Sequence, residues 1–516
     1  MTALRILAVV AGVAATGLAD LRWLRVAQRE HYLPGSASRF ALRWWWGFGP
    51  NRVLIVAAVV GVIGSPLSPV LALAAALAVG AGPLRLPLLG RTPGPVAWTP
   101  RLRTVAAVTV GAQVAVIAAA VLLGGGVPVT ALVALLAPLS VDGALAALGP
   151  VEDHKADAFV KQAQRRLAEV NPTVVALTGS YGKTTTKMYA AHLMQGAKTV
   201  VPSPASFNNR AGLSRAVNEN LAPGTEVFIA EMGTYGPGEI ADLCRWCPPR
   251  IAAITAIGPV HLERFGTEDA IVRAKSEIFG PAEVAVLNVD DPRLSAVADA
   301  QEAAGKRVVR CSAVDAGADV SAREVDGRLV VARAGETIAD LAAPDVPAGN
   351  VAVAVALALC VGTPEAAVAS GLTTLPPVPN RRTVTTLSTG ATAVDDTFNS
   401  NPAGCRAALA TMEKLGQADH KRVVVTPGMV ELGPRQAVEN RAFAAAAGRA
   451  ATDVIVVGWT NRPALVAGLR EAEAADRARA TLLLADTHAE AVAWVRANTG
   501  PGDVVLYENQ LPDHYP

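Results

Sequence analysis

The length, composition and charge of the chain exclude several classes of protein. Its 516 residues are enough for about three domains, and its apolar fraction of 51% is high for a soluble enzyme. Residues 1–150 carry a net charge of +8, from eleven arginines and three acidic residues, which leaves −6 for residues 151–516 because the whole chain carries +2. A basic, apolar N-terminal region on a mildly acidic remainder indicates a membrane anchor on a cytoplasmic body and argues against a nucleic-acid-binding protein.

The five cysteines are too few and too scattered for a disulfide framework. Cys244 and Cys247 form a single CxxC pair with no second pair, which excludes a zinc ribbon and gives only weak support for a redox role. Ordinary reduced thiols of a cytoplasmic protein are the prediction.

The N-terminal region, residues 1–150, is predicted to be helical and to span a membrane. The predicted apolar segments are 3–19, 53–82, 104–123 and 129–148. Two prolines interrupt 53–82, so this segment is either one kinked helix or a hairpin of two short helices. The segments 20–52, with six arginines and three consecutive tryptophans, and 83–103, with four arginines, are predicted to be basic loops at the membrane surface. The positive-inside rule places both loops, and everything after residue 150, in the cytoplasm.

A charged helix over residues 151–170 is predicted to link this region to a doubly wound α/β domain over residues 171–374. The predicted strands are 174–177, 226–230, 250–255, 284–288 and 307–311, and the predicted closing helices are 350–360 and 364–371. Asp326 and Gly327 lie between two short apolar runs and predict a hairpin turn.

A proline-rich stretch at 375–379 predicts a domain boundary, and residues 375–516 predict a second, smaller α/β domain without a phosphate loop. Its predicted strands are 393–395, 422–426, 453–457, 481–484 and 503–507. Its predicted helices are 402–415, 435–451, 462–474 and 487–498.

The chemistry of the chain is concentrated where the first strand of residues 171–374 ends. The strand runs into a short glycine loop and then a helix, through the residues Thr178, Gly179, Ser180, Tyr181, Gly182, Lys183, Thr184 and Thr185. Backbone amides and the positive end of the helix dipole in such a loop bind phosphate oxygens. Lys183 supplies a charge for the phosphates, and the Thr184 hydroxyl can bind Mg²⁺. The alternative, a tight turn with an incidental lysine, explains the motif less well.

Two further strand ends carry candidate ligands. Glu231 follows an apolar strand, and in doubly wound sheets ligands lie at the carboxyl ends of strands, so Glu231 is predicted to bind Mg²⁺, with an N-cap or turn role as the alternative. His261 follows the next strand and is a ligand or a structural histidine on this reasoning alone. Lys275 by itself predicts a solvated charge.

Together these motifs resemble those of the Mur ligases, ATP-dependent enzymes that join an amino acid or dipeptide to a carboxylate in peptidoglycan synthesis. The resemblance covers roughly residues 171–510. It rests on the short glycine loop, 206–209, Glu231 with 236–239, 261–263 and 274–279, in the family's order. The motifs at 395–402 and 428–433 are most similar to the branch that adds D-Ala-D-Ala.

The resemblance implies that ATP phosphorylates a carboxylate and that an amine attacks the acyl phosphate, giving an amide, ADP and phosphate. It implies one Mg²⁺ on Thr184 and Glu231, and a second on His261, with Lys275 at a position that can be carbamylated in relatives. The implied nucleotide contacts are Asn350 and Arg381. The implied substrate contacts are Asn208, Asn209, Asp396, Asn399 and Asn401.

The chain departs from the family at both substrate-recognition ends. Membrane segments replace the domain that binds the UDP-sugar, 351–355 lacks an asparagine found in relatives, and 507–510 reads Tyr-Glu-Asn-Gln where the D-Ala-D-Ala-adding branch has Lys-Gly-Ser. The reaction type is therefore predicted, while the substrate pair stays open between D-Ala-D-Ala addition to a muramyl peptide, with a lipid-linked acceptor as one option, and a polyglutamate-type or other peptide ligation.

Two other functions fit the sequence less well, and the oligomeric state stays open. An ATPase that drives transport is disfavoured because Asp142 is the only charge in the last two apolar segments. A catalytically inactive binding module is disfavoured because Lys183, Glu231, His261 and Lys275 are all present.

Overall fold

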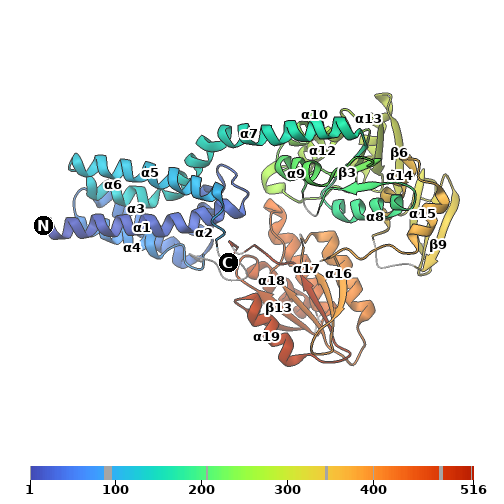
Figure 1. Cartoon of the computed structure of the whole chain (residues 1–516). Coiled ribbons are helices and arrows are strands. Elements are labelled where there is room, and N and C mark those ends of the chain that lie inside the picture. The colour runs from blue at the N-terminus through green and yellow to red at the C-terminus, as the bar shows by residue number, and fades with distance from the viewer. Residues whose placement is uncertain are drawn as a thin grey trace. The chain divides into compact units, whose positions relative to one another are not determined.

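The structure, a computed structural model, describes residues 2–86, 96–204, 207–342, 347–379, 381–398, 400–475, 480–512 and 514–515. The chain forms two compact units, which Figure 1 draws in one view. The first is Met1–His154 together with Leu511–Pro516, and the second is Lys155–Gln510. The predicted domain limits at 170 and 374 fall inside the second unit and stay predictions.

The first unit is a bundle of helices, drawn in blue and light blue in Figure 1. Its helices are α1 (Thr2–Arg29), α2 (Ser36–Gly47), α3 (Gly49–Gly64), α4 (Pro69–Ala81), α5 (Pro100–Leu122), α6 (Gly126–Leu135) and the first part of α7 (Ala137–Val170). Small residues let the helices approach closely: a Cβ on Gly61 of α3 would lie 2.6 Å from the carbonyl oxygen of Leu71 in α4. The segment 53–82 is therefore a hairpin of two short helices, and the single kinked helix is wrong.

The predicted loop over 20–52 is wrong, because α1 continues to Arg29 and α2 follows. The charges expected to favour a loop have partners within the bundle instead. Arg22 donates to the carbonyl oxygen of Gly80 in the last turn of α4 at 2.9 Å. Asp142 accepts from the backbone N–H of Ala37 and Ser38, at 3.2 and 2.8 Å, and so caps the start of α2.

Two other predicted elements have different bounds in the structure. The single segment 129–148 is broken into α6 and α7, which meet at a bend of 71°. The linker helix over 151–170 is not a separate element, because α7 continues through Pro150 to Val170.

By length and composition, two helices of the described residues are able to cross a bilayer, Ala3–Arg29 and Pro100–Leu122. The number rises to four if the bent pairs α2 with α3 and α6 with α7 are each counted as one span. The 13-residue α4 is apolar but shorter.

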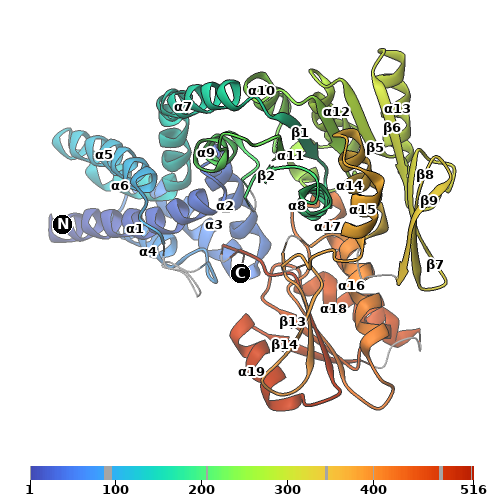
Figure 2. The ribbon, with the colours of Figure 1, turned by 45° about the vertical axis from the view of Figure 1, so that its right-hand side comes forward.

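In its described residues, the second unit contains two sheets, which confirms the α/β prediction. The larger has nine strands in the order β2-β3-β1-β4-β5-β6-β7-β8-β9. They are β1 (Thr173–Thr178), β2 (Val200–Pro202), β3 (Val227–Glu231), β4 (Ile251–Ile254), β5 (Val284–Asn288), β6 (Arg307–Ser312), β7 (Val320–Val325), β8 (Arg328–Arg333) and β9 (Glu336–Ala342). The sheet is parallel except for β7-β8 and β8-β9, which Figure 2 shows in yellow. Asp326 and Gly327 turn between β7 and β8 with positive φ, as predicted.

Helices cover both faces of the larger sheet because its strands are apolar on both sides. Val175 and Leu177 of β1 pack with α8 (Lys183–Gln195), α14 (Ala348–Cys360) and α15 (Glu365–Leu372). Val174 and Ala176 pack on the other face with the end of α7 and with α9 (Arg210–Asn220), α10 (Glu239–Trp246) and α13 (Pro292–Ala303). Each of these buried Val and Leu side chains stabilises the fold by roughly 1.5–3 kcal/mol.

The smaller sheet has the strand order β10-β11-β15-β12-β13-β14, in which only β10 is antiparallel. Its elements are β10 (Thr383–Thr386), β11 (Thr392–Asp396), α16 (Pro402–Leu415), β12 (Arg422–Thr426), α17 (Gln436–Ala450), β13 (Asp453–Val457), α18 (Arg462–Ala474), β14 (Thr481–Ala485), α19 (His488–Asn498) and β15 (Val504–Glu508). α16, α17 and α18 pack on one face and α19 on the other. The predicted strands and helices of this region are confirmed.

Candidate active site

The glycine loop lies between β1 and α8, as the sequence predicts. Gly182 has a φ of +77°, and a Cβ there would lie 2.3 Å from Oδ1 of Asn350, so this position requires glycine. Ser180 is held on the loop after β4, because its backbone N–H donates to the Ala256 carbonyl at 2.7 Å and its Oγ to the Gly258 carbonyl at 3.1 Å. The loop is thus held by the segment after β4 on one side and by Asn350 on the other, and glycine loops of this kind present backbone amides to phosphate oxygens.

The lysine and threonines of the loop begin α8. Lys183 donates from Nζ to the carbonyl of Gly179 at 2.7 Å, across the loop. Burial lowers the pKa of Lys183, a change that Glu231 opposes and Arg381 and Lys187 reinforce. Positive charge therefore converges on the loop from three side chains, which is an environment for an anion.

Glu231, at the end of β3, is the centre of the polar site. β1 and β3 are parallel neighbours with Leu177 opposite Glu231, so the carboxylate lies beside the loop. Its Oε2 accepts from Thr184 Oγ1 at 3.0 Å and from Lys187 Nζ at 2.9 Å, and its Oε1 accepts from Asn208 Nδ2 at 3.1 Å. Burial raises the pKa of Glu231, but the charges of Lys187 and Lys183 outweigh it, and the pKa lies below its usual value. Glu231 is thus an ionised carboxylate beside a hydroxyl, a pair of hard oxygen atoms that suits Mg²⁺.

Lys187 was missed by sequence reasoning. Its side chain is only 2% exposed, and it forms a buried ion pair with Glu231. The available signal was its position four residues after Lys183, on the same face of α8.

Lys275, near the end of α12 (Glu268–Ser276), is buried, so the reading of a solvated charge is wrong. Burial lowers its pKa well below the usual value, and Lys183 lowers it further. A lowered pKa favours the neutral amine of Lys275, the form that reacts with CO₂.

His261 lies directly before α11 (Leu262–Phe265), in the loop after β4, with a φ of +60°. Its Nδ1 contacts Oε2 of Glu431, which comes from the loop after β12 of the smaller sheet. Burial lowers the pKa of His261, although Glu431 opposes the change. Glu431 lies in the motif at 428–433, but the sequence alone does not pair it with His261.

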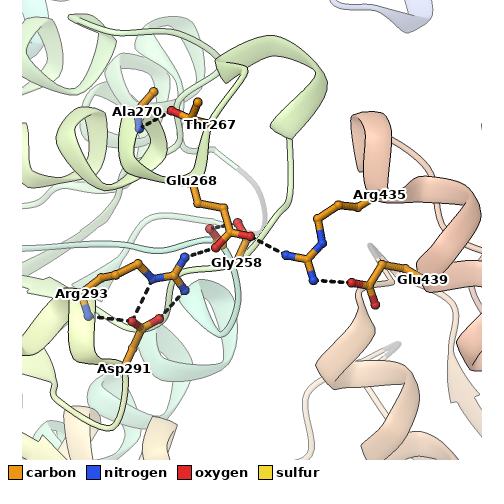
Figure 3. A network of polar contacts seen from close by, with 9 residues as sticks. Gly258, Thr267, Glu268, Ala270, Asp291, Arg293, Arg435 and Glu439 are labelled. Atoms are coloured by element: carbon orange, nitrogen blue, oxygen red, sulfur yellow. Dashed lines mark hydrogen bonds and ion pairs between the residues drawn. The ribbon is translucent and has the colours of Figure 1, made fainter.

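A network of ion pairs continues along the same boundary between the two sheets. Glu268 lies between Arg293 and Arg435 in Figure 3, and Arg435 also contacts Glu439. The distance from Arg435 Nη1 to Glu268 Oε1 is 2.6 Å. Arg435 and Glu439 belong to the smaller sheet's helices and Glu268 and Arg293 to the larger sheet's, so the network joins the two sheets.

The remaining predicted site residues divide into two groups. Asn208 contacts Glu231, and the side chain of Asn350 packs against the backbone of Gly182. Burial lowers the pKa of Arg381, and the nearby charges of Asp396 and Glu231 oppose this change. Asn209 and Asn401 instead cap helices, each accepting from a backbone N–H at 2.9 Å. Asn399 lies outside the described residues.

Asp396 and Glu508 are buried acids at the carboxyl ends of neighbouring strands β11 and β15. Burial raises the pKa of Asp396 to about 6, with Arg381 opposing the rise. Glu508 is fully buried, and it accepts from Thr426 Oγ1 at 3.1 Å and from Cys405 Sγ at 3.0 Å. Burial raises the pKa of Glu508 to about 7, despite the hydrogen bonds from Cys405 and Ser400.

Glu508→Gln is expected to raise the free energy of unfolding at pH 8 and to flatten its pH dependence. The pKa of Glu508 is about 7 in the folded protein against an ordinary 4.5, so the folded state keeps a proton that the unfolded chain releases. Stability of the wild type therefore falls as the pH rises between these values, by about 3 kcal/mol through this group. Denaturant unfolding at pH 5 and pH 8 measures the difference. Glu473→Gln, at an exposed position of α18, should keep the wild-type slope, and an unchanged slope in Glu508→Gln would contradict the prediction.

The CxxC pair has no catalytic features. Cys244 and Cys247 are free and buried, and burial raises the pKa of Cys244 to about 12. Both therefore stay protonated thiols, in agreement with the prediction of ordinary reduced cysteines.

Comparison with known proteins agrees with this geometry. A family model described as the Mur ligase middle domain matches residues 177–356, and one described as Mur ligase, glutamate ligase domain, matches residues 380–507. The UDP-N-acetylmuramoyl-tripeptide–D-alanyl-D-alanine ligase of Mycobacterium leprae is 32% identical over 75% of this chain and 82% of the relative. The enzyme of that name from Mycobacterium tuberculosis (strain CDC 1551 / Oshkosh) is 33% identical over 65% of this chain and 69% of the relative.

Solved structures show the same similarity. The MurF ligase of Thermotoga maritima in complex with ADP has a TM-score of 0.56 and 25% identity, and the alignment covers 69% of this chain and 80% of that one. The chain therefore belongs to the Mur ligase family and is an ATP-dependent ligase that joins a carboxylate to an amine.

Proposed function

We propose that this ligase adds D-Ala-D-Ala to a muramoyl tripeptide through an acyl-phosphate intermediate. The relatives at 32–33% identity are named for D-Ala-D-Ala addition to a UDP-N-acetylmuramoyl tripeptide. The observation that carries the proposal is the arrangement of Lys183, Thr184 and Glu231 around one glycine loop, within an alignment that covers most of those relatives.

The reaction has two steps, and the side chains act mainly through charge and position. A carboxylate oxygen of the acceptor attacks the γ-phosphorus of ATP, and ADP leaves. The amine nitrogen then attacks the acyl carbon, phosphate leaves, and the amine loses a proton. Lys183 and the loop amides bind the phosphates, where they offset the charge that a carboxylate brings to the γ-phosphate.

Thr184 and Glu231 are proposed to hold one Mg²⁺, and His261 a second. The fit at the first position is good, because Thr184 Oγ1 and Glu231 Oε2 are 3.0 Å apart and Glu231 is ionised. At the second position His261 is the one ready ligand among the described residues, and a carbamate on Lys275 would supply further oxygen atoms. When bound, the ions supply positive charge to the transferring phosphoryl group.

The N-terminal helices are proposed to hold the ligase in a membrane, with the catalytic unit in the cytoplasm and a lipid-linked muramoyl peptide as acceptor. The support is the apolar length of α1 and α5 and the net charge of +8 over residues 1–150. A lipid-linked acceptor would explain why this region stands in the place of a UDP-sugar-binding domain. In reconstituted vesicles, a turnover on lipid-linked acceptor no faster than on soluble UDP-linked acceptor would contradict this part of the proposal.

One experiment tests the reaction itself. The full chain, in detergent with ATP and Mg²⁺, should release phosphate only when both a muramoyl tripeptide and D-Ala-D-Ala are present. Phosphate release that needs no amine would favour an ATPase that drives another process. Activity with glutamate in place of D-Ala-D-Ala would favour a polyglutamate-type ligase.

Lys275→Ala is expected to lose most activity and to regain part of it when a short carboxylate such as acetate is added. The reason is that the proposed carbamate contributes oxygen atoms that a small carboxylate can replace in the vacated space. Phosphate release measured against acetate concentration tests this. Lys183→Ala should show no rescue, since a carboxylate cannot replace a cation, and the absence of rescue in Lys275→Ala would count against carbamylation.

A further inference from the structure

His261 and Glu431 are brought together from the two different sheets of the second unit. His261 follows β4 of the larger sheet, and Glu431 follows β12 of the smaller one, 170 residues further along the chain. Nδ1 of His261 is hydrogen-bonded to Oε2 of Glu431. Their side chains are 21% and 26% exposed, so the pair is largely removed from solvent.

Both residues have an unusual backbone conformation. The φ angles are +60° for His261 and +64° for Glu431, in the left-handed region that residues other than glycine rarely adopt. Strained residues of this kind persist only where the surrounding structure holds them, and they gather at active sites and ligand clamps. Two such residues that contact each other across a boundary between sheets are therefore evidence of a functional contact.

Other contacts hold the loop of Glu431 against the segment that carries His261. Gly433 has a φ of +54°, and a Cβ there would lie 3.2 Å from the backbone nitrogen of Glu263. Arg435 contacts Glu268 at 2.6 Å, as Figure 3 shows. Residues 431–435, called here the latch, thus contact residues 261–268 at three places.

The chemistry of the histidine ring gives the latch a role beyond holding these two segments together. A neutral imidazole carries its proton on one nitrogen and a lone pair on the other. With an ionised Glu431 as its partner, Nδ1 keeps the proton and donates it, so the lone pair is on Nε2. Histidines that bind metals almost always donate their other N–H to a carboxylate, a backbone carbonyl or water, which fixes the ring and its tautomer.

We propose that Glu431 is a positioning residue for a divalent cation at His261, so that cation binding and docking of the latch favour each other. The proposal rests on the proposed role of His261 as a ligand. Because such coupling is reciprocal, a cation on Nε2 stabilises the docked latch as much as the docked latch raises the affinity for the cation. The second cation site is then complete only when the latch is docked.

The test uses Mn²⁺ as the probe, with the full chain in detergent and a non-hydrolysable ATP analogue. Electron paramagnetic resonance counts bound Mn²⁺ and gives the affinity of each site, and hydrogen exchange reports on residues 262–266 and the latch. The wild type should bind two Mn²⁺, and the second should slow exchange in both segments. Glu431→Gln, which keeps the shape of the side chain, should weaken the second site about 10- to 100-fold and remove the slowing, with the first site unchanged.

Arg435→Gln is the matched control. It removes a partly exposed ion pair from the same latch without contacting His261, so the affinity of the second site should fall less than about threefold. Equal losses in Glu431→Gln and Arg435→Gln would show that Glu431 only holds the latch, and full affinity in Glu431→Gln would show that it has no effect on the cation. Either result overturns the proposal.

His261→Ala separates this inference from the proposed function. It should lose the second Mn²⁺ site altogether. If it keeps both sites, the proposed role of His261 as a ligand is wrong. If it loses the second site while Glu431→Gln does not, only the role of Glu431 is wrong. Retention of the first Mn²⁺ site in each variant shows that the glycine loop is still folded.

Discussion

Lys183→Ala is expected to lower kcat/KM by about a thousandfold or more while leaving the fold intact. The ammonium group crosses the glycine loop to the carbonyl of Gly179 at 2.7 Å, so it lies where the phosphates of ATP are proposed to bind. Removing one preorganised donor for developing negative charge typically costs a factor of about 10² to 10³, and Lys183 contributes a full charge as well. Phosphate release with both substrates present measures the loss.

The stability of Lys183→Ala should change little. Lys183 lies near Lys187, and loss of one of two neighbouring cations relieves repulsion as well as removing a hydrogen bond. Lys161→Ala, at an exposed position of α7, is the control for a lost lysine away from the loop and should keep wild-type activity. More than a tenth of wild-type activity in Lys183→Ala would contradict the proposed role of the loop.

Glu231→Gln is expected to lose both activity and stability, the latter by about 3–5 kcal/mol. Glu231 and Lys187 are each only 2% exposed and lie 2.9 Å apart, so the variant leaves a buried ammonium group without its counter-charge. The free energy of unfolding of the full chain, from denaturant titration followed by fluorescence, measures the loss of stability. Phosphate release measures the loss of activity.

The double variant Glu231→Gln with Lys187→Met separates the two roles of Glu231. Replacing both charges removes the uncompensated cation, and a buried ion pair exchanged for uncharged side chains of similar volume often leaves stability unchanged. The double variant should therefore recover most of the lost stability but none of the activity. A double variant as unstable as Glu231→Gln would show that the pair itself does not account for the loss.

Many elements of the second unit are predictable from short stretches of sequence because their signals are local. The helix over Pro402–Leu415 is an example: Asn401 caps it by accepting from Gly404 at 2.9 Å, and Pro402 occupies its first turn, where no backbone donor is required. The strands Val284–Asn288 and Arg422–Thr426 are apolar runs bounded by polar residues. The glycine at position 182 similarly indicates a positive φ, which other residues rarely adopt.

Elements without such local signals were missed. β9 (Glu336–Ala342) alternates poorly between apolar and polar residues, and it is a strand because β8 offers it an unpaired edge. In the first unit, arginines at 22 and 25 favoured a loop, yet α1 continues through them, because other helices supply acceptors such as the Gly80 carbonyl. The continuation of α1 past Arg22 thus depends on an acceptor, the Gly80 carbonyl, that lies 58 residues further along the chain.

The sequence by itself predicted a phosphate-binding and Mg²⁺-binding loop, since the loop from Thr178 to Thr185 and the acid that ends β3 carry their chemistry in neighbouring residues, and the type of reaction followed from the resemblance of the ordered motifs to the Mur ligases. Only the tertiary structure decided how that chemistry is arranged. It buried Lys275, paired Lys187 with Glu231 across 44 residues, and brought Glu431 to His261 across 170. The physical reason is that periodicity and turn signals act over a few residues, whereas burial and ion pairing depend on which strands become neighbours in a sheet and which domains meet.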